Sequence, residues 1–413
     1  MASSNLESAV KYDILSPAFV SDPHPTLHAM REQDPVYWHP LLHSWVLTRY
    51  ADIVRVLRDG GSHFSARRVE QYGVGAPETV QAKLRVCNEF IARWFAFVDP
   101  PEHTRLRGLI ARAFNVQSID RLRPRIASIV DEVLTTCRER GEIELVADLA
   151  EPLPRVVFCE LIGIPVEDLH VLDGHAGMIM GLLGAGLATA EVVEGSYAGV
   201  VALDDYFKRQ IARRRGNPSD DLLSRLMETR VDDRGLSDDD LVAMCVTMML
   251  GDHDTTTKLI ANAAVTLIRR PEAAQRLREQ PARIDAVIEE VMRYESPTFA
   301  TFRRAVVDNE EFDGVKIKAG DFVLNVLCAA NRDPGRFPEP DRFDLERPEN
   351  RHLSFSGGAH TCPGALLARV AARAAVAGLF TRFSEVSLAT DSLEWVPNLM
   401  LRGPRAVPLR LSV

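Results

Sequence analysis

The longest apolar pattern in the chain covers residues 237–270 and predicts one long buried helix. Residues 241–250 and 259–268 are apolar on nearly every face, which is typical of a helix that runs through the middle of a large protein. Ser237 and Asp240 form a capping box at its start, and Pro271 marks its end. At 1.5 Å per residue this helix spans roughly 50 Å, about the width of a large domain.

Elsewhere the hydrophobic spacing predicts a mainly α fold with a smaller β component. Apolar residues recur at helical spacing in residues 105–114, 119–140, 204–214, 222–230, 273–280 and 364–380. Residues 35–50 predict a small hairpin, residues 312–326 predict short strands, and residues 331–351 read as a Pro- and Asp-rich coil. We expect one large domain over residues 1–413, with an N-terminal arm of about residues 1–20.

Composition excludes several classes of protein. The 413 residues are 46% hydrophobic and carry a net charge of −9, so a broad cationic surface for nucleic acid is not expected. The six cysteines form no CxxC pair, which excludes a zinc finger or a dithiol redox site. No signal peptide is visible, and no apolar run is convincing as a membrane span. We therefore expect a soluble, cytoplasmic protein with no membrane or nucleic-acid partner.

Polar residues interrupt the long apolar helix at residues 251–257, Gly-Asp-His-Asp-Thr-Thr-Thr. Acidic and hydroxyl groups in a buried helix cost several kcal/mol unless they are satisfied. Two interpretations follow from the residues: a buried hydrogen-bond network, or a cavity beside the helix that needs protons or water.

A glycine-rich segment, residues 355–364, leads into the last predicted helix and contains Cys362. A helix N-terminus favours the thiolate form of such a cysteine. The residues alone leave three roles open for Cys362: a nucleophile with His360 as its base, a metal ligand, or a buried structural thiol.

Taken together, five segments resemble the cytochrome P450 family of haem-thiolate monooxygenases, in particular its soluble bacterial members. In chain order they are residues 99–107, 251–256, 290–293 with Arg342, 304–320 and 355–364. The last of these is the most specific, because it resembles the family's haem-binding loop.

The resemblance implies a haem b cofactor and a role for each matching residue. Cys362 would be the iron ligand, within a loop that begins at Phe355. Asp254 and Thr255 would deliver protons to bound O₂ on the opposite side of the haem. The residues that would hold the haem propionates are His103, Arg107, Arg304 and His360. The residues that would brace the haem loop are Glu290, Arg293 and Arg342.

Three departures from the family pattern affect these expectations, and one of them is Pro363, which follows Cys362 and has no backbone N–H to donate to the sulfur. Ser356 replaces a glycine, and a positive φ there would cost about 1 kcal/mol or more. Asp252 stands where the family usually has glycine, so it is a candidate substrate contact together with Phe299 and Met400. The substrate itself is not identified by the sequence.

The leading function is hydroxylation or epoxidation of a small to medium-sized organic molecule, in secondary metabolism. Alternatives are oxidative radical coupling by the same haem enzyme, a non-catalytic haem sensor, and a cysteine hydrolase. Because the chain has no flavin or nicotinamide motif, the resemblance implies a ferredoxin and an NAD(P)H-dependent reductase as electron donors. Their predicted docking site is a patch formed by Arg105, Arg112, Arg369 and Arg373.

Overall fold

A computed structural model describes residues 10–69, 76–184, 188–308 and 310–412, and the chain divides into two compact units. Unit 1 comprises Met1–Ser65, Ala127–Pro152 and Thr255–Val413, and unit 2 comprises Ala66–Ile126 and Leu153–Asp254. Helix α13 (Asp238–Ile268) contributes its first part to unit 2 and its second part to unit 1. The prediction of a single domain over the whole chain stays a prediction.

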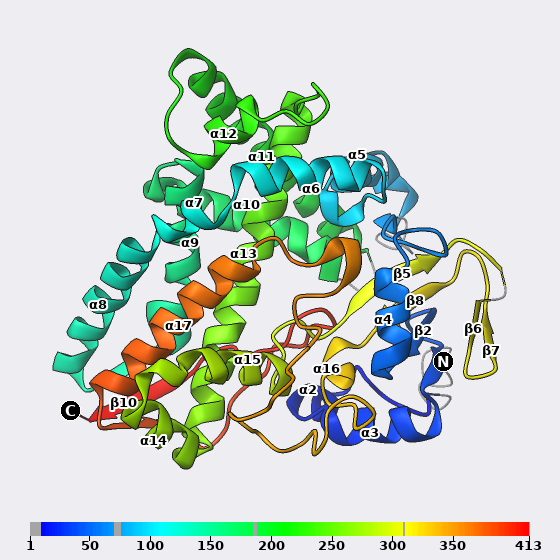
Figure 1. Cartoon of the computed structure of the whole chain (residues 1–413). Helices are drawn as coiled ribbons and strands as arrows, with labels where there is room; N and C mark the ends of the chain where they lie inside the picture. The colour runs from blue at the N-terminus through cyan, green and yellow to red at the C-terminus, as the bar shows by residue number, and fades with distance from the viewer. Residues whose placement is uncertain (1–9, 70–75, 185–187, 309, 413) are drawn as a thin grey trace. The chain divides into compact units, whose positions relative to one another are not determined.

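Unit 2 is built from helices that precede and include the start of α13 (Figure 1). They are α5 (Gln81–Ala92), α6 (Glu102–Ala113), α7 (Val116–Asp120), α9 (Pro152–Ile162), α10 (Leu169–Gly184), α11 (Ala190–Gly216) and α12 (Leu222–Glu228). Helices α10 and α11 pack closely, because Gly199 has no side chain where a Cβ would lie 2.6 Å from the carbonyl oxygen of His175.

Unit 1 combines helices from both ends of the chain with the β-structure. Its helices are α2 (Pro17–Ser21), α3 (His24–Gln33), α4 (Tyr50–Arg58), most of α8 (Arg123–Arg140), α14 (Pro271–Glu279), α15 (Ile284–Tyr294), α16 (Leu327–Ala330) and α17 (Ala365–Arg382). A π-helical turn covers Val146–Ala150.

The strands of unit 1 form a five-stranded sheet, a three-stranded sheet and a separate hairpin. The five-stranded sheet has the order β1 (Val36–His39), β2 (Ser44–Leu47), β8 (Phe322–Asn325), β5 (Thr301–Ala305) and β3 (Phe64–Ser65), and only β2 and β8 are parallel. The three-stranded sheet has the order β4 (Glu142–Glu144), β10 (Pro408–Ser412) and β9 (Glu385–Leu388). Strands β6 (Glu310–Phe312) and β7 (Val315–Ile317) form the hairpin, which stands apart from the larger sheet in Figure 1. Both larger sheets therefore join strands that are distant in sequence.

Most of the predicted elements are confirmed. The structure is mainly helical with small sheets, residues 36–47 form the expected hairpin, and residues 331–357 are a coil. The helix predicted over residues 119–140 is wrong as one element, because the helix is interrupted at residues 121–122. Pro124 has no N–H to donate and is accommodated in the first turn of a new helix, α8.

Helix α13 begins as predicted. The backbone N–H of Asp240 donates to the Ser237 hydroxyl, and the Ser237 N–H donates to the Asp240 carboxylate, each at 3.2 Å. Within unit 1, residues 259–264 are all buried, including Asn262. The Asn262 amide donates to the carbonyl oxygens of Glu295 and Arg402, each at 3.0 Å, so this polar side chain ties the helix to two loops.

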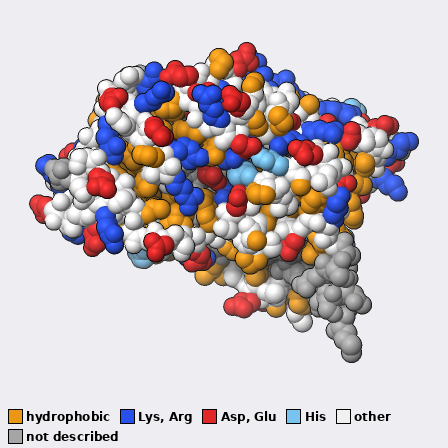
Figure 2. All heavy atoms as spheres, turned by 90° about the horizontal axis from the view of Figure 1, so that it is seen from below, with side chains coloured by type: hydrophobic (Ala, Val, Ile, Leu, Met, Phe, Trp, Pro, Cys, Tyr) orange, Lys and Arg blue, Asp and Glu red, His pale blue; other side chains and the backbone are white. Residues whose placement is uncertain are grey.

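On the face shown in Figure 2, charge is dispersed and not gathered by sign. Acidic and basic side chains alternate across the face shown in Figure 2, with apolar side chains between them. None of the described helices is long and apolar enough to cross a membrane.

Candidate functional site

The Cys362 loop lies at the end of the long coil of unit 1. A single 3₁₀ turn covers Gly358–His360, Gly364 is the N-cap residue of α17, and Cys362 lies between these two elements. The N–H of Cys362 donates to the carbonyl oxygen of Phe355 at 2.9 Å, which closes the loop. The candidate residues Phe355, His360 and Cys362 are thus brought together and are all half-buried.

Two positions in this loop have left-handed backbone conformations. Gly358 has φ = +65°, and a Cβ there would lie 2.2 Å from the carbonyl oxygen of Leu57, at the end of α4. Ser356 has φ = +62°, so this non-glycine residue does adopt the positive φ that is unfavourable for it. The loop therefore rests directly on the backbone of α4, and Gly358 cannot carry a side chain in this geometry.

Cys362 differs from the other five cysteines, which are buried. Burial raises the pKa of the Cys87 thiol to about 11 and that of Cys159 and Cys245 to about 12, so these thiols stay protonated. Cys362 is half-exposed and lies at the start of a helix, the arrangement that favours a thiolate.

Arg369, one turn into α17, supports the loop. Its side chain donates to Glu289 at 2.6 and 2.9 Å and stacks over the Phe355 ring, 4.4 Å from the centroid. The hydrogen bond with Glu289 raises the pKa of Arg369, and the charge of Cys362 contributes in the same direction. Although burial opposes it, the hydrogen bonds from Arg369 and His352 lower the pKa of Glu289 to about 2. A permanent cation therefore acts on the Cys362 sulfur.

Glu290 and Arg293 form the centre of a buried ionic network. Their side chains are only 1% and 0% exposed, and they are joined by two hydrogen bonds of 2.7 and 2.9 Å. Arg293 also donates to the carbonyl oxygens of Asn331, Pro340 and Arg342, at 2.7 to 3.0 Å. One guanidinium on α15 therefore holds the coil that leads to the cysteine loop.

The arginine that completes this network is Arg347, and the prediction of Arg342 is wrong. The Arg342 side chain is 60% exposed and pairs with Glu339 at 3.1 Å, so only its carbonyl oxygen takes part. The Nε of Arg347 lies 3.3 Å from Oε1 of Glu290, with a side chain that is 7% exposed. The coil contains several arginines, and sequence spacing alone could not tell which one turns inward.

Two further coil residues were missed by the sequence analysis. Asn331 is fully buried, accepts from the N–H of Leu353 at 2.7 Å, and donates to the Ser354 hydroxyl at 2.8 Å. Ser354 in turn donates to the carbonyl oxygen of Met292 on α15. Buried polar residues in a coil are a usable signal, because they need partners.

The candidate propionate-binding residues lie on three elements. In unit 2, His103 and Arg107 are one turn apart on the same face of α6, with His103 buried and Arg107 half-buried. In unit 1, Arg304 on β5 is half-buried between Phe322 of β8 and Ser65 of β3 in the sheet register. His360 lies in the cysteine loop. Their role toward a haem stays a prediction.

The polar segment of α13 stays helical throughout, with Asp252, Asp254 and Thr255 half-buried. His253 is buried, packs edge-to-face on Phe158 and lies 3.5 Å from Asp173. Thr257 donates to the carbonyl oxygen of Ala150 at 2.9 Å. His253 and Thr257 therefore match the hydrogen-bond-network interpretation, and the proton-delivery role of Asp254 and Thr255 stays a prediction.

The candidate substrate contacts Phe299 and Met400 lie side by side in unit 1. The Phe299 N–H donates to the carbonyl oxygen of Met400 at 2.8 Å. Phe299 is buried in a hydrophobic cluster, with its ring 5.8 Å from that of Phe19, and the half-buried Met400 packs against the same cluster. Packing therefore explains Phe299, and substrate contact by either residue stays a prediction.

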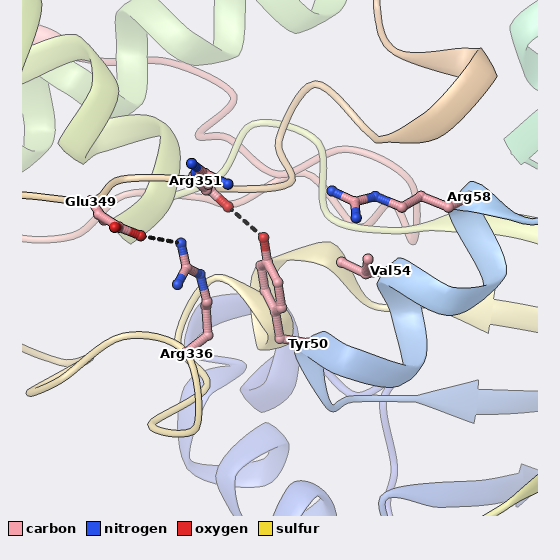
Figure 3. A pocket seen from close by; sticks show the side chains of 6 residues that line it. All are labelled: Tyr50, Val54, Arg58, Arg336, Glu349 and Arg351. Atoms are coloured by element: carbon pink, nitrogen blue, oxygen red, sulfur yellow. Dashed lines mark hydrogen bonds and ion pairs between the residues drawn. The ribbon is translucent and has the colours of Figure 1, made fainter.

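A shallow cationic pocket of about 330 Å³ lies beside the cysteine loop, between α4 and the long coil (Figure 3). It is lined by Tyr50, Val54, Arg58, Arg336, Glu349 and Arg351. Arg336 pairs with Glu349 at 2.9 Å. Among the six lining residues, Figure 3 marks no ion pair of the Arg58 or Arg351 guanidinium group, and three arginines face one glutamate, so the pocket carries an excess of positive charge.

The four arginines of the predicted docking patch all have partners within the protein, and their docking role stays a prediction. Carboxylates neutralise three of them: Arg105 pairs with Glu102, Arg369 with Glu289 and Arg373 with Asp285. Arg112 donates to the carbonyl oxygen of Arg230. These arginines hold neighbouring elements together instead of offering free charge.

Comparison with known proteins gives a consistent answer. The family model for cytochrome P450 matches residues 201–395. Cytochrome P450 109 of Bacillus spizizenii is 32% identical over 394 residues, which are 94% of this chain and 92% of that protein. Cyclomarin C epoxidase CymV of Salinispora arenicola is 34% identical over 400 residues, 95% of this chain and 98% of that protein.

Solved structures agree with these relatives. The crystal structure of the myxobacterial cytochrome P450 CYP267B1 in complex with myristic acid has a TM-score of 0.87 and 34% identity, and covers 98% of this chain and 99% of that one. These relatives belong to one class of enzymes, the oxidoreductases that incorporate oxygen into their substrates. The chain belongs to the cytochrome P450 family and is a P450 monooxygenase related to bacterial members.

The residues around Cys362 fit the haem-thiolate cofactor of that family. Glycine at position 364 keeps the space beside the sulfur open, since a Cβ there would lie 3.8 Å from Cys362 Sγ. Among the described residues, no group of three or more His, Cys, Asp and Glu side chains could hold a metal ion. A single cysteine is what a porphyrin-bound iron requires of its thiolate side.

The first prediction concerns Gly358. We expect Gly358→Ala to distort the loop and abolish haem retention, because the added Cβ would collide with the Leu57 carbonyl. Gly357→Ala is the control, because Gly357 is extended and its Cβ would lie 3.7 Å from Leu57. Haem content of the purified variants is the measurement, and equal retention would contradict the packing described here.

The second prediction tests the assignment of Arg347. Arg347→Met should lower the free energy of unfolding by about 3 kcal/mol or more, because it leaves the buried Glu290 carboxylate short of a partner. Arg342→Met removes only an exposed pair and should cost less than about 1 kcal/mol. Denaturant unfolding measures both, and the reverse order would restore Arg342 to the network.

Proposed function

We propose that this protein is a haem b monooxygenase in which Cys362 is the iron ligand. The observation that carries the proposal is the Cys362 loop: a half-exposed cysteine at a helix start, under a nearby cation, with glycines on either side. A thiolate-ligated haem activates O₂ with two electrons and two protons for insertion of one oxygen atom into a substrate.

The remaining candidate residues are assigned by what their side chains can do. His103, Arg107, Arg304 and His360 hold the two propionates, since cationic donors suit carboxylates. Thr255 orients a water molecule and Asp254 relays protons along α13. Glu290, Arg293 and Arg347 keep the cysteine loop in place and take no part in the reaction.

We infer that the substrate is a small to medium-sized organic molecule from secondary metabolism. The similarity to cyclomarin C epoxidase supports this class. Asp252 and Met400 are the residues that we expect to contact it. Radical coupling by the same enzyme is the alternative, and product mass distinguishes the two: gain of one oxygen against loss of two hydrogens.

We also propose a single P450 domain that works in the cytoplasm.

We propose that a ferredoxin, reduced by an NAD(P)H-dependent reductase, supplies the electrons and docks at the cationic pocket of Figure 3. The Cα of Arg58 would lie 3.0 Å from a Cβ on Gly358, so the pocket adjoins the cysteine loop. Arg58 and Arg351 are unpaired among the described residues and suit the carboxylates of an acidic electron carrier.

The third prediction tests the iron ligand. The reduced, CO-treated protein should show the long-wavelength Soret band of thiolate-ligated haem, and Cys362→Ala should lose it. Cys137→Ala is the control, because Cys137 is a buried thiol on α8. A protein that binds no haem, or a Cys362→Ala spectrum identical to the wild type, would refute the proposed function.

The fourth prediction tests the docking pocket. Arg58→Glu and Arg351→Glu should each raise the KM for reduced ferredoxin about tenfold at low salt, with a smaller effect at high salt. Arg269→Glu is the matched control, since Arg269 is also exposed and lies at the far end of α13. Steady-state reduction kinetics measure the effect, and an unchanged KM would place the docking surface elsewhere.

A further inference from the structure

Arg68 is a buried arginine in unit 2 for which the described residues supply no carboxylate partner. Its side chain lies in the segment between β3 and α5, and the residue is 6% exposed. Nη1 donates to the carbonyl oxygen of Ala66 at 3.1 Å, and the guanidinium stacks over the Phe97 ring, 4.4 Å from the centroid. Within the described ranges its Nε has no hydrogen-bond partner, and no acidic side chain pairs with it.

Several other buried arginines of this protein pair with carboxylates. Each of the following has a carboxylate partner: Arg214 with Asp221, Arg293 with Glu290, and Arg402 with Glu295. Even the neighbouring Arg67, whose side chain is 66% exposed, faces Asp99 at 3.8 Å. Because a buried charge is costly without a counter-charge, Arg68 is a cation suited to an anion that the described residues do not supply.

Trp94 provides a second unused donor beside the same ring. It is 3% exposed, its ring centroid lies 6.0 Å from that of Phe97, and its Nε1 has no acceptor among the described residues. The indole N–H can only donate a hydrogen bond, so a buried Trp94 is stabilised by an acceptor, as a buried Arg68 is stabilised by an anion. Two buried donors thus flank Phe97, and both belong to unit 2.

We propose that Arg68 and Trp94 bind a carboxylate group. A guanidinium fork matches the two oxygens of a carboxylate, and one carboxylate balances its single charge. The Phe97 face keeps the arginine side chain in place, which lowers the ordering cost of binding. The proposal rests on the proposed function, since two carboxylates are then available: that of an organic acid bound as substrate, or a haem propionate.

The substrate source is tested with dodecanoic acid and 1-dodecanol, which differ only in the head group. If the site holds a substrate carboxylate, the wild type binds the acid about tenfold more tightly than the alcohol. Arg68→Met abolishes this preference, and Trp94→Phe reduces it severalfold. Arg85→Met, an exposed arginine on α5, keeps it and controls for loss of one charge. Calorimetry measures binding whether or not haem is present, so a failure of the haem assignment is seen separately.

The propionate source is tested by the rate of haem transfer to excess apomyoglobin. If the site holds a propionate, Arg68→Met speeds haem loss about tenfold relative to the wild type and Arg85→Met, and Arg68→Lys has an intermediate rate. Haem dimethyl ester, which has no free carboxylate, removes the difference between the wild type and Arg68→Met.

If folded Arg68→Met and Trp94→Phe match the wild type in both measurements, the proposal is overturned. If Arg68→Met does not fold, Trp94→Phe decides the question, because it keeps an aromatic ring at this position and removes the N–H donor.

Discussion

The buried contact between Glu290 and Arg293 holds the part of the chain on which the chemistry depends. These two side chains sit on α15, yet through Arg347 and several carbonyl oxygens they fix a coil of more than twenty residues that has no helix or strand of its own. A coil has few backbone hydrogen bonds to keep its shape, so side chains must do this instead. An ion pair buried on α15 therefore helps to set the position of the loop that carries Cys362.

The sequence predicted the long helix, the cysteine loop and the Glu290–Arg293 pair, because each depends on a local pattern. Spacing fixed the start of α13 through Ser237 and Asp240, and glycines marked the loop around Cys362. The errors concern side-chain direction in irregular chain. Arg342 and Arg347 are five residues apart in the same coil, and only the fold decides which one reaches Glu290. The break between α7 and α8 was also not predicted, because the apolar pattern continues across it.

Arginine serves three physical purposes in this protein. Paired with carboxylates, as in Arg369 and Arg105, it joins helices and loops and leaves little free charge. Exposed and unpaired among the described residues, as in Arg58, it gives a local positive field on a chain whose net charge is −9. Buried without a carboxylate partner among the described residues, as in Arg68, it is a charge that we propose an external carboxylate balances. Counting basic residues in the sequence cannot separate these cases, because their partners come from distant segments.

The contact of Gly358 with Leu57 has a consequence for how the protein matures. About three hundred residues separate these positions, and the backbone of α4 forms the support on which the cysteine turn lies. During synthesis α4 is made early, and the turn that packs on it is made only when nearly the whole chain is complete. The turn that carries Cys362 can therefore take its final position only after both ends of unit 1 have met. A chain that lacks α4 would keep the cysteine but lose the backbone on which its turn rests.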